Sequence, residues 1–174
     1  RRDGRIVVSA RLPSRSKTLA AAAGAVADRL RAVAESSSGG RVDVVAYGVG
    51  GVLVRSALRE HGAAAHVANL VTLGSPHRGT ALALLGLPAP LGELRPGCAF
   101  VDALVRGENL PALAHVAAIA SPFDAIVFPF DLAYCPGAFN VTVERVGHFS
   151  MLYSERVYTL LAENLDVSAR VAGT

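Results

Sequence analysis

A short β-branched run, a glycine-rich turn and a helix-compatible segment follow one another between residues 42 and 60, and this succession limits the fold more than any other feature of the chain. Residues 42–46 read Val-Asp-Val-Val-Ala, which is typical of a buried strand, and residues 52–60 are compatible with a helix. Gly48, Gly50 and Gly51 lie in the turn between them. A buried strand that leads directly into a helix favours a parallel sheet covered by helices.

The same alternation continues along the chain and predicts an α/β fold with a mostly parallel sheet flanked by helices. The glycine of His61-Gly62 is expected to close the helix that follows the turn. The final helix has Leu152, Val157, Tyr158, Leu160 and Leu161 available for its buried face. The predicted strands are residues 5–10, 42–46, 68–74, 116–120 and 140–143, and the predicted helices are residues 17–35, 52–60 and 151–165.

Length and composition favour one domain that spans residues 1–174. Hydrophobic residues make up 52% of the chain, which is enough for a substantial core. Residues 80–111 differ from the rest because they are rich in Leu, Pro and Gly and contain only short helical patterns. This segment is the best candidate for a lid or cap.

The net charge argues against nucleic-acid binding, and the cysteine content does not indicate the cellular compartment. The net charge is +3, and the arginines that produce it are scattered, so we expect no nucleic-acid partner. No apolar run is long enough for a transmembrane segment. Cys98 and Cys135 are compatible with one disulfide or with two buried thiols. The chain begins at Arg1, without a methionine or the apolar core of a signal peptide, so we expect a processed, trimmed or partly observed chain of unknown localisation.

No metal or other cofactor is expected. His61, His66 and His77 do not have a spacing typical of a zinc site, and a solvated or capping role is favoured for them. Ser56, Ser75, Cys98 and Cys135 do not stand on a strand-to-helix turn, so none of them is a good candidate for a nucleophile.

Several segments resemble the bacterial triacylglycerol lipase and esterase branch of the α/β-hydrolase superfamily, over about residues 5–165. Residues 41–51 are similar to the strand and G-x-S-x-G nucleophile turn of that family. The most specific match is Leu-Val-Thr-Leu-Gly-Ser-Pro-His-Arg-Gly-Thr at residues 70–80, which resembles the next strand and its Pro-His-Arg-Gly turn. Residues 94–100 resemble the stretch before the lid-side helix, and the loops at Asp124 and His148 resemble the acid-bearing and histidine-bearing loops.

The resemblance implies a role for each matching position. Asp124 and His148 occupy the acid and base positions, and the backbone N–H of Val49 would be one oxyanion donor. Gly48 occupies the nucleophile position, after Tyr47 where the family often has histidine. Glycine has no hydroxyl group to deprotonate, so the acyl-enzyme route cannot begin there.

The resemblance also implies that an amino-terminal part of the full fold is lacking. In the superfamily, a strand that leads into a His-Gly oxyanion loop lies between the strand that residues 5–10 match and the strand of the nucleophile turn. No His-Gly pair precedes the turn in this chain. An open sheet edge is costly, so we expect a strand from a separate polypeptide, or from a segment outside the chain, to fill the gap. Direct hydrogen bonding between residues 5–10 and 42–46 would contradict this expectation.

Three functional hypotheses follow. The first is a degenerate lipase-like domain, a pseudoenzyme with a binding role towards an acyl or lipid ligand or a structural role in an assembly. The second is a genuine lipase or esterase whose serine was mutated and whose amino terminus was trimmed or not observed. The third is a thioesterase or acyltransferase relative with the same turn.

Overall fold

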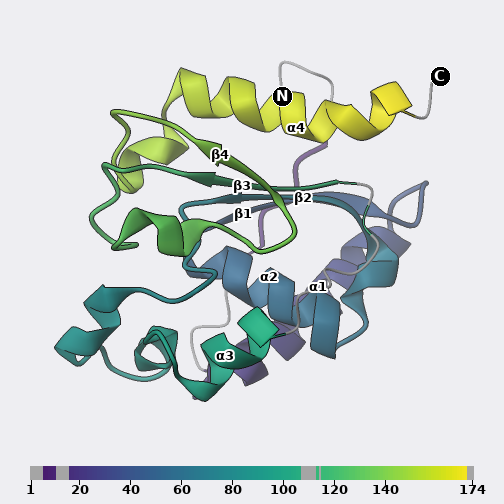
Figure 1. Cartoon of the computed structure of the whole chain (residues 1–174). Coiled ribbons are helices and arrows are strands. Elements are labelled where there is room, and N and C mark those ends of the chain that lie inside the picture. Colours follow the sequence, from purple (N-terminus) through teal and green to yellow (C-terminus); the bar gives the residue numbers. More distant parts are fainter. Residues whose placement is uncertain (1–5, 11–15, 107–112, 114, 172–174) are drawn as a thin grey trace.

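The computed structural model describes residues 6–10, 16–106, 113 and 115–171. Its centre is a parallel sheet of four strands in the order β1-β2-β3-β4 (Figure 1). The strands are β1 (Val42–Tyr47), β2 (Val67–Leu73), β3 (His115–Ala120) and β4 (Phe139–Thr142). The parallel sheet predicted from the sequence is therefore observed, and β1 and β4 are its edges.

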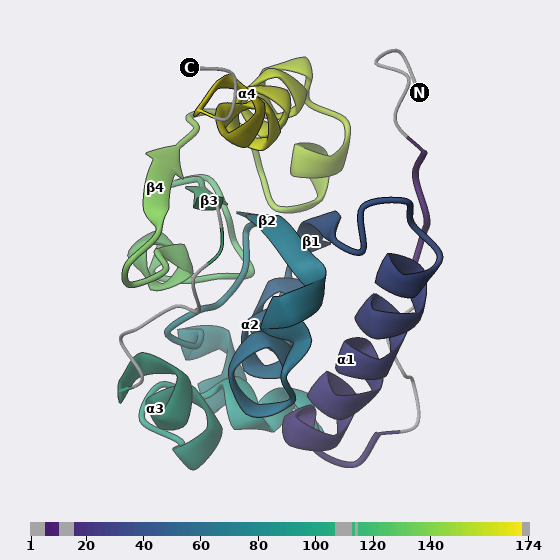
Figure 2. The same ribbon diagram turned by 90° about the vertical axis from the view of Figure 1, so that its right-hand side faces the viewer.

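Helices cover both faces of the sheet. The face shown lower in Figure 1 packs against α1 (Leu19–Glu35) and α2 (Val49–Glu60), and α3 (Ala99–Arg106) lies farther out on that side. The other face packs against α4 (Glu155–Val171). Figure 2 shows the same layers from the side, with α4 on one side of the strands and α1, α2 and α3 on the other.

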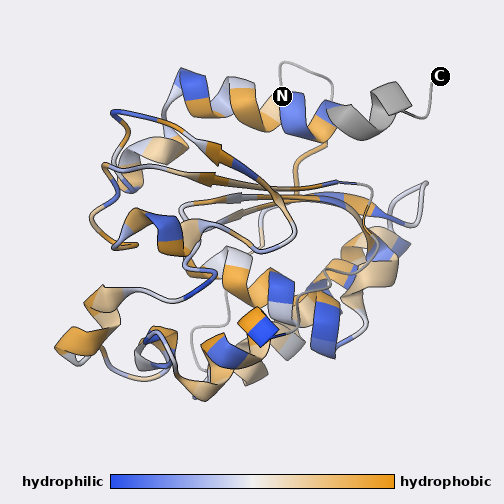
Figure 3. Cartoon of the chain, in the orientation of Figure 1, coloured by the Kyte–Doolittle hydropathy of each residue, from blue (hydrophilic) through white to orange (hydrophobic). Residues whose placement is uncertain are grey.

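An apolar layer packs against each face of the sheet. Val71, Leu73 and Ile119 pack towards α4 with Met151 and Val157. On the opposite face, a second layer joins the sheet to α1 and α2, and its buried members are Ala27, Ala46, Val54, Ala57, Leu58, Ala63, Val67 and Leu70. The alternation of side chains along each strand places successive residues in different layers. Figure 3 shows hydrophobic residues in the strands and mixed hydropathy along α4, which has one buried and one exposed side.

The carboxy-terminal helix differs from its prediction. Residues 149–152 form a 3₁₀ turn, η5 (Phe149–Leu152), and α4 begins only at Glu155. Val157 is buried as expected and Leu160 and Leu161 are partly buried, but Leu152 and Tyr158 are about half exposed. Leu152 lies outside the helix, and Tyr158 directly follows the buried Val157, so the face that packs on the sheet does not include them.

The predicted strand at residues 5–10 is wrong for its described part, residues 6–10, which have no regular secondary structure. Arg5 lies outside the described residues. Ile6, Val7 and Val8 are 93%, 67% and 50% exposed. A strand needs a neighbouring edge to pair with, and among the described residues β1 pairs only with β2. The two segments are therefore not hydrogen-bonded to each other.

A groove runs along the edge of β1 that pairs with no described strand. It has a volume of about 480 Å³ and lies between β1, α1 and the segment that ends at Ala10. Val44, Val45 and Tyr47 line its β1 side, and Val26 and Leu30 line its α1 side. The sequence of β1 is apolar enough for a doubly buried strand, yet Val45 is 45% exposed at this edge.

The segment at residues 80–111 contains short helices only, as far as it is described. They are η2 (Ala81–Leu85), η3 (Leu91–Leu94) and α3, and residues 107–111 lie outside the described part. Two arginines of α2 hold the end of α3, because Arg55 donates to Leu104 O at 2.8 Å and Arg59 donates to Ala103 O at 2.6 Å. This end of the segment is thus tied to the helix that follows the glycine turn.

Candidate functional site

The turn between β1 and α2 holds Gly48 at the carboxyl end of the sheet. Its φ is 54° and its ψ is −130°, in a region that strongly favours glycine. Gly48 N–H donates to Leu73 O at 2.9 Å, and Gly51 N–H donates back to Gly48 O at 3.2 Å. Val49 is the first residue of α2, so its N–H has no acceptor within the helix. The backbone thus takes a sharp strand-to-helix turn with residue 48 at its apex.

Close packing behind the turn requires a second glycine. A Cβ atom added to Gly51 would lie 2.9 Å from Thr72 Cγ2 and would overlap with the side chain of Ser75. Such contacts are shorter than packed atoms tolerate. Gly51 therefore allows the first turn of α2 to approach the end of β2 closely.

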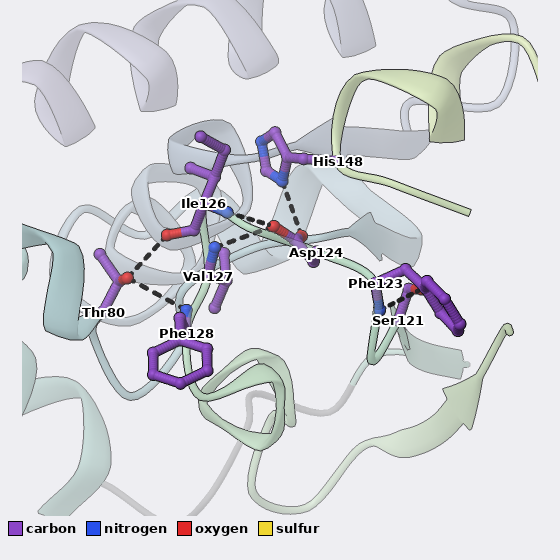
Figure 4. A network of polar contacts seen from close by, with 8 residues as sticks. All are labelled: Thr80, Ser121, Phe123, Asp124, Ile126, Val127, Phe128 and His148. Atoms are coloured by element: carbon purple, nitrogen blue, oxygen red, sulfur yellow. Dashed lines mark hydrogen bonds and ion pairs between the residues drawn. The ribbon is translucent and has the colours of Figure 1, made fainter. Parts of the chain in front are cut away.

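Asp124 lies in the loop after β3 and is 4% exposed. Its Oδ1 accepts the backbone N–H groups of Ile126 and Val127 at 2.8 and 2.9 Å (Figure 4). These two hydrogen bonds fix the carboxylate and leave Oδ2 directed at His148, whose Nδ1 is 2.7 Å away. The carboxylate therefore acts both as a loop cap and as the partner of the imidazole.

His148 follows β4 and is 8% exposed. Its ring lies between two aromatic rings, with centroids 4.8 Å from Tyr47 and 5.5 Å from Phe149. The Tyr47 hydroxyl is buried and has no hydrogen-bond partner among the described residues. Burial, and secondarily the charges of Asp124 and Tyr153, raise the pKa of Tyr47. The imidazole is therefore held by packing on its sides and by the carboxylate at Nδ1.

The structure brings Gly48, Asp124 and His148 together at the ends of β1, β3 and β4. A Cβ atom built on Gly48 would lie 3.5 Å from His148 Nε2. Because the ionised carboxylate can only accept, it orients Nδ1 as the donor and leaves Nε2 as an acceptor that faces residue 48. A side-chain oxygen at this position would come within hydrogen-bonding reach of Nε2. The site has the geometry of an acid–base pair directed at a strand-to-helix turn.

Sequence reasoning missed the part that Gly74 plays at this site. Gly74 directly follows β2 and has a φ of 52°, and a Cβ atom there would lie 2.9 Å from Asp124 Oδ2 and 3.0 Å from His148 Nδ1. Its N–H donates to Ile119 O at 2.9 Å. A glycine as the last residue of the predicted strand at residues 68–74 was the available signal. Gly74 makes room for the pair.

A second buried polar cluster lies behind the turn, in the stretch that resembles the Pro-His-Arg-Gly motif. His77 Nε2 lies 2.9 Å from Thr72 Oγ1, and Arg55 donates to His77 O at 3.3 Å. Both His77 and Arg55 are fully buried. Burial, assisted by the charge of Arg55, lowers the pKa of His77 to about 3, and burial also lowers the pKa of Arg55. This cluster is packed into the core and joins α2, β2 and α3.

Other candidate groups are not assembled into sites in the described residues. Cys98 and Cys135 are free thiols, so the disulfide alternative is not observed; Cys135 is buried and Cys98 is partly buried. The part of the chain that the structure describes has no cluster of three His, Cys, Asp or Glu residues that could hold a metal ion. It also has no helix whose length and hydropathy suit a membrane span.

Solved structures similar to this one include lipases and esterases. No family model matches the chain. The mature form of the Bacillus licheniformis lipase BlEst2 superposes with a TM-score of 0.71 at 22% identity, over 84% of this chain and 74% of that one. The Aspergillus fumigatus lipase B superposes with a TM-score of 0.72 at 19% identity, over 83% of this chain but 41% of that one.

The chain has the α/β-hydrolase fold. A further similar structure of this fold is the propeptide form of the Bacillus lipase, with a TM-score of 0.65 at 24% identity, over 83% of this chain and 40% of that one. The chain thus spans about three quarters of the mature Bacillus lipase and about two fifths of the other two structures.

Proposed function

We propose that the chain is a lipase- or esterase-like domain that keeps the acid–base pair of a hydrolase but does not form an acyl-enzyme, and that it binds an acyl or lipid ligand. The observation that carries the proposal is the position of His148 Nε2, 3.5 Å from where a Cβ atom of residue 48 would lie. The base is directed at a residue without a hydroxyl group. Covalent catalysis requires an activated nucleophile, and the turn has none.

Exposed apolar side chains next to His148 support an acyl ligand. Phe149, Leu152 and Tyr153 follow His148 in the chain and are 69%, 51% and 86% exposed. We call these three residues the apolar rim. Neighbouring apolar side chains left open to solvent beside a polar pair are typical of a ligand-binding surface. The rings of Phe123 and Phe128 point away from the pair in Figure 4, so they do not belong to the rim.

Titration of the ¹⁵N-labelled chain with octanoate tests this function. We expect saturable shifts of the Gly48 amide and of the rim, and weaker binding when Phe149→Ser removes an aromatic ring from the rim. Phe139→Ser is the matched control, because Phe139 is 60% exposed but begins β4, at the opposite end of the strands from Gly48. Equal weakening by both variants, or no saturable shift, would contradict an acyl-binding site at the rim.

The alternative function is a genuine carboxylic-ester hydrolase whose serine was mutated and whose amino terminus was trimmed. The observation in its favour is that Gly48 keeps a φ of 54° and faces an aligned Asp124–His148 pair, which a purely structural role does not need. Peptide mass mapping of the protein from its natural source would give the native residue at position 48. A serine there would favour the hydrolase, and a glycine would favour the domain without a nucleophile.

We further propose that a strand of chain outside these 174 residues occupies the groove at the open edge of β1. Extended backbone would pair with the β1 edge, and apolar side chains would cover Val45 and meet the exposed Ile6 and Val7.

Amide hydrogen exchange tests this completion of the sheet. In the 174-residue chain alone, we expect the outward-facing amides of β1 to exchange faster than those of β2, which has a strand on each side. In the protein isolated from its natural source, the β1 amides should be protected to the same degree as those of β2. Unprotected β1 amides in both samples would mean that nothing pairs with this edge.

A further inference from the structure

Among the described side chains, only that of His148 lies close to the position into which a nucleophile side chain would project from Gly48. Apart from the chain neighbours of Gly48 and its own helix backbone, the only described atoms within 4 Å of a Cβ atom built there are His148 Nε2 at 3.5 Å and Cε1 at 3.8 Å. A water molecule needs polar partners at about 3 Å. His148 Nε2 is such a partner, because Asp124 holds the proton of the ring at Nδ1.

The space beside Gly48 is also next to the amino terminus of α2. The N–H of Val49 begins the helix and has no intrahelical acceptor, so it is available to a carbonyl oxygen of a bound acyl group. The partial positive charge of a helix amino terminus favours an oxygen that becomes negative. A base, a position for water and an oxyanion donor therefore lie around Gly48.

We propose that this site hydrolyses activated acyl esters slowly and without a covalent intermediate, with His148 as general base for a water molecule beside Gly48. His148 Nε2 removes a proton from the water, whose oxygen forms a bond to the carbonyl carbon while the carbonyl electron pair moves to its oxygen. The tetrahedral intermediate then breaks the bond to the leaving alkoxide, which receives the proton from His148. Ester and water give acid and alcohol, and the protein returns to its starting state.

This inference rests on the proposed function, since the acyl group must bind at the same place. His148 would be the catalytic residue, because it exchanges a proton with the reacting atoms. Asp124 would be a positioning residue that holds Nδ1 by a hydrogen bond and so directs Nε2 at the water. Loss of the Asp124 carboxylate should lower kcat and leave the affinity for octanoate unchanged. If Asp124 had a merely structural role, its loss would not separate kcat from affinity in this way.

Initial rates with p-nitrophenyl acetate test the proposal on the 174-residue chain. We expect linear release of p-nitrophenol without a burst, and no acetyl adduct in the intact mass. General-base catalysis typically accelerates a reaction by about 10²–10⁴-fold, so His148→Gln should lower the rate at least about tenfold. His61→Gln is the control for hydrolysis by surface imidazole, because His61 is exposed and lies at the opposite end of α2. That variant should keep the native rate.

Gly48→Ala provides a second, independent variant. Its methyl group would project towards His148, 3.5 Å from Nε2, and would exclude a water molecule from the space between Gly48 and the ring without altering Asp124 or His148. We expect the rate to fall to that of His148→Gln. A burst, an acetyl adduct, or an unchanged rate in His148→Gln would overturn the proposal. Octanoate binding separates the two claims: if it persists without His148-dependent turnover, only this inference fails, and if octanoate does not bind, the proposed function fails as well.

Discussion

Asp124 Oδ2 lies 2.7 Å from His148 Nδ1, although the two residues come from different loops and are separated by 24 positions. The contact is buried, and the other oxygen of the same carboxylate is held by two backbone N–H groups. Buried polar groups are stable only when their hydrogen bonds are satisfied. The pair therefore contributes to the fold as well as to the proposed chemistry.

Asp124→Ala should lower the free energy of unfolding substantially. The change removes three hydrogen bonds to a buried carboxylate and leaves the N–H groups of Ile126 and Val127 without their acceptor. We expect a loss of about 3 kcal/mol in urea unfolding. Asp131→Ala is the matched control, since that carboxylate is about half exposed and lies 3.9 Å from Arg78, and should cost less than about 1 kcal/mol. Equal losses would contradict this role of Asp124.

Gly51→Ala should destabilise the turn by steric overlap. An added Cβ would lie 2.9 Å from Thr72 Cγ2 and would overlap with Ser75, so α2 would have to move away from β2. Overpacking of this kind typically costs about 1–3 kcal/mol. Gly39→Ala is the control, because a Cβ on Gly39 meets no atom within 4 Å. Thermal unfolding should separate the two variants, and identical melting temperatures would show that the turn is less tightly packed than described.

Arg55→Ala should also be strongly destabilising, for a different reason. The guanidinium group of Arg55 is fully buried and donates to His77 O and Leu104 O, so its loss leaves a cavity and two carbonyl groups without this donor. We expect about 3 kcal/mol in denaturant unfolding. Arg106→Ala, whose side chain is 76% exposed, should change stability by less than about 0.5 kcal/mol. A neutral Arg55→Ala would mean that α3 is not held by this residue.

His77 should make stability depend on acidic pH. Its pKa is about 3 in the folded protein and about 6.5 in the unfolded chain, so the unfolded state binds the extra proton between these values. The contribution of His77 is therefore complete above about pH 6.5 and decreases as the pH falls towards 3, with a slope approaching ~1.4 kcal/mol per pH unit. Urea unfolding between pH 7 and pH 4.5 should show a shallower pH dependence for His77→Gln. Parallel curves would contradict the buried, neutral state of His77.

Much of the fold could be predicted because its elements have strong local signals. The β-branched runs at β1 and β2 and the alanine-rich run at α1 have local patterns typical of the structures that they form. Residues 6–10 have an equally apolar pattern but form no strand, because a strand also depends on an edge with which to pair. Local pattern was therefore sufficient only where the sheet supplies a neighbour.

The candidate site was less predictable than the sheet. Gly48, Asp124 and His148 could be named from the motifs that surround them, but their distances depend on how three strand ends come together. Gly74 and Arg55 are different cases. A glycine after a strand is usually explained by a turn, and an arginine within a helix usually lies at the surface. Only the packing shows that Gly74 makes room for the pair and that Arg55 is buried.

The central claim is that residue 48 occupies the nucleophile position of a hydrolase site whose base is His148. It is tested most directly by intact-mass measurement of the Gly48→Ser variant after incubation with a fluorophosphonate, which labels activated serine hydroxyl groups. We expect one adduct, mapped to residue 48, and none in the native chain or in Gly48→Ser combined with His148→Gln. A folded Gly48→Ser variant that remains unlabelled, or that is labelled equally without His148, would contradict the account.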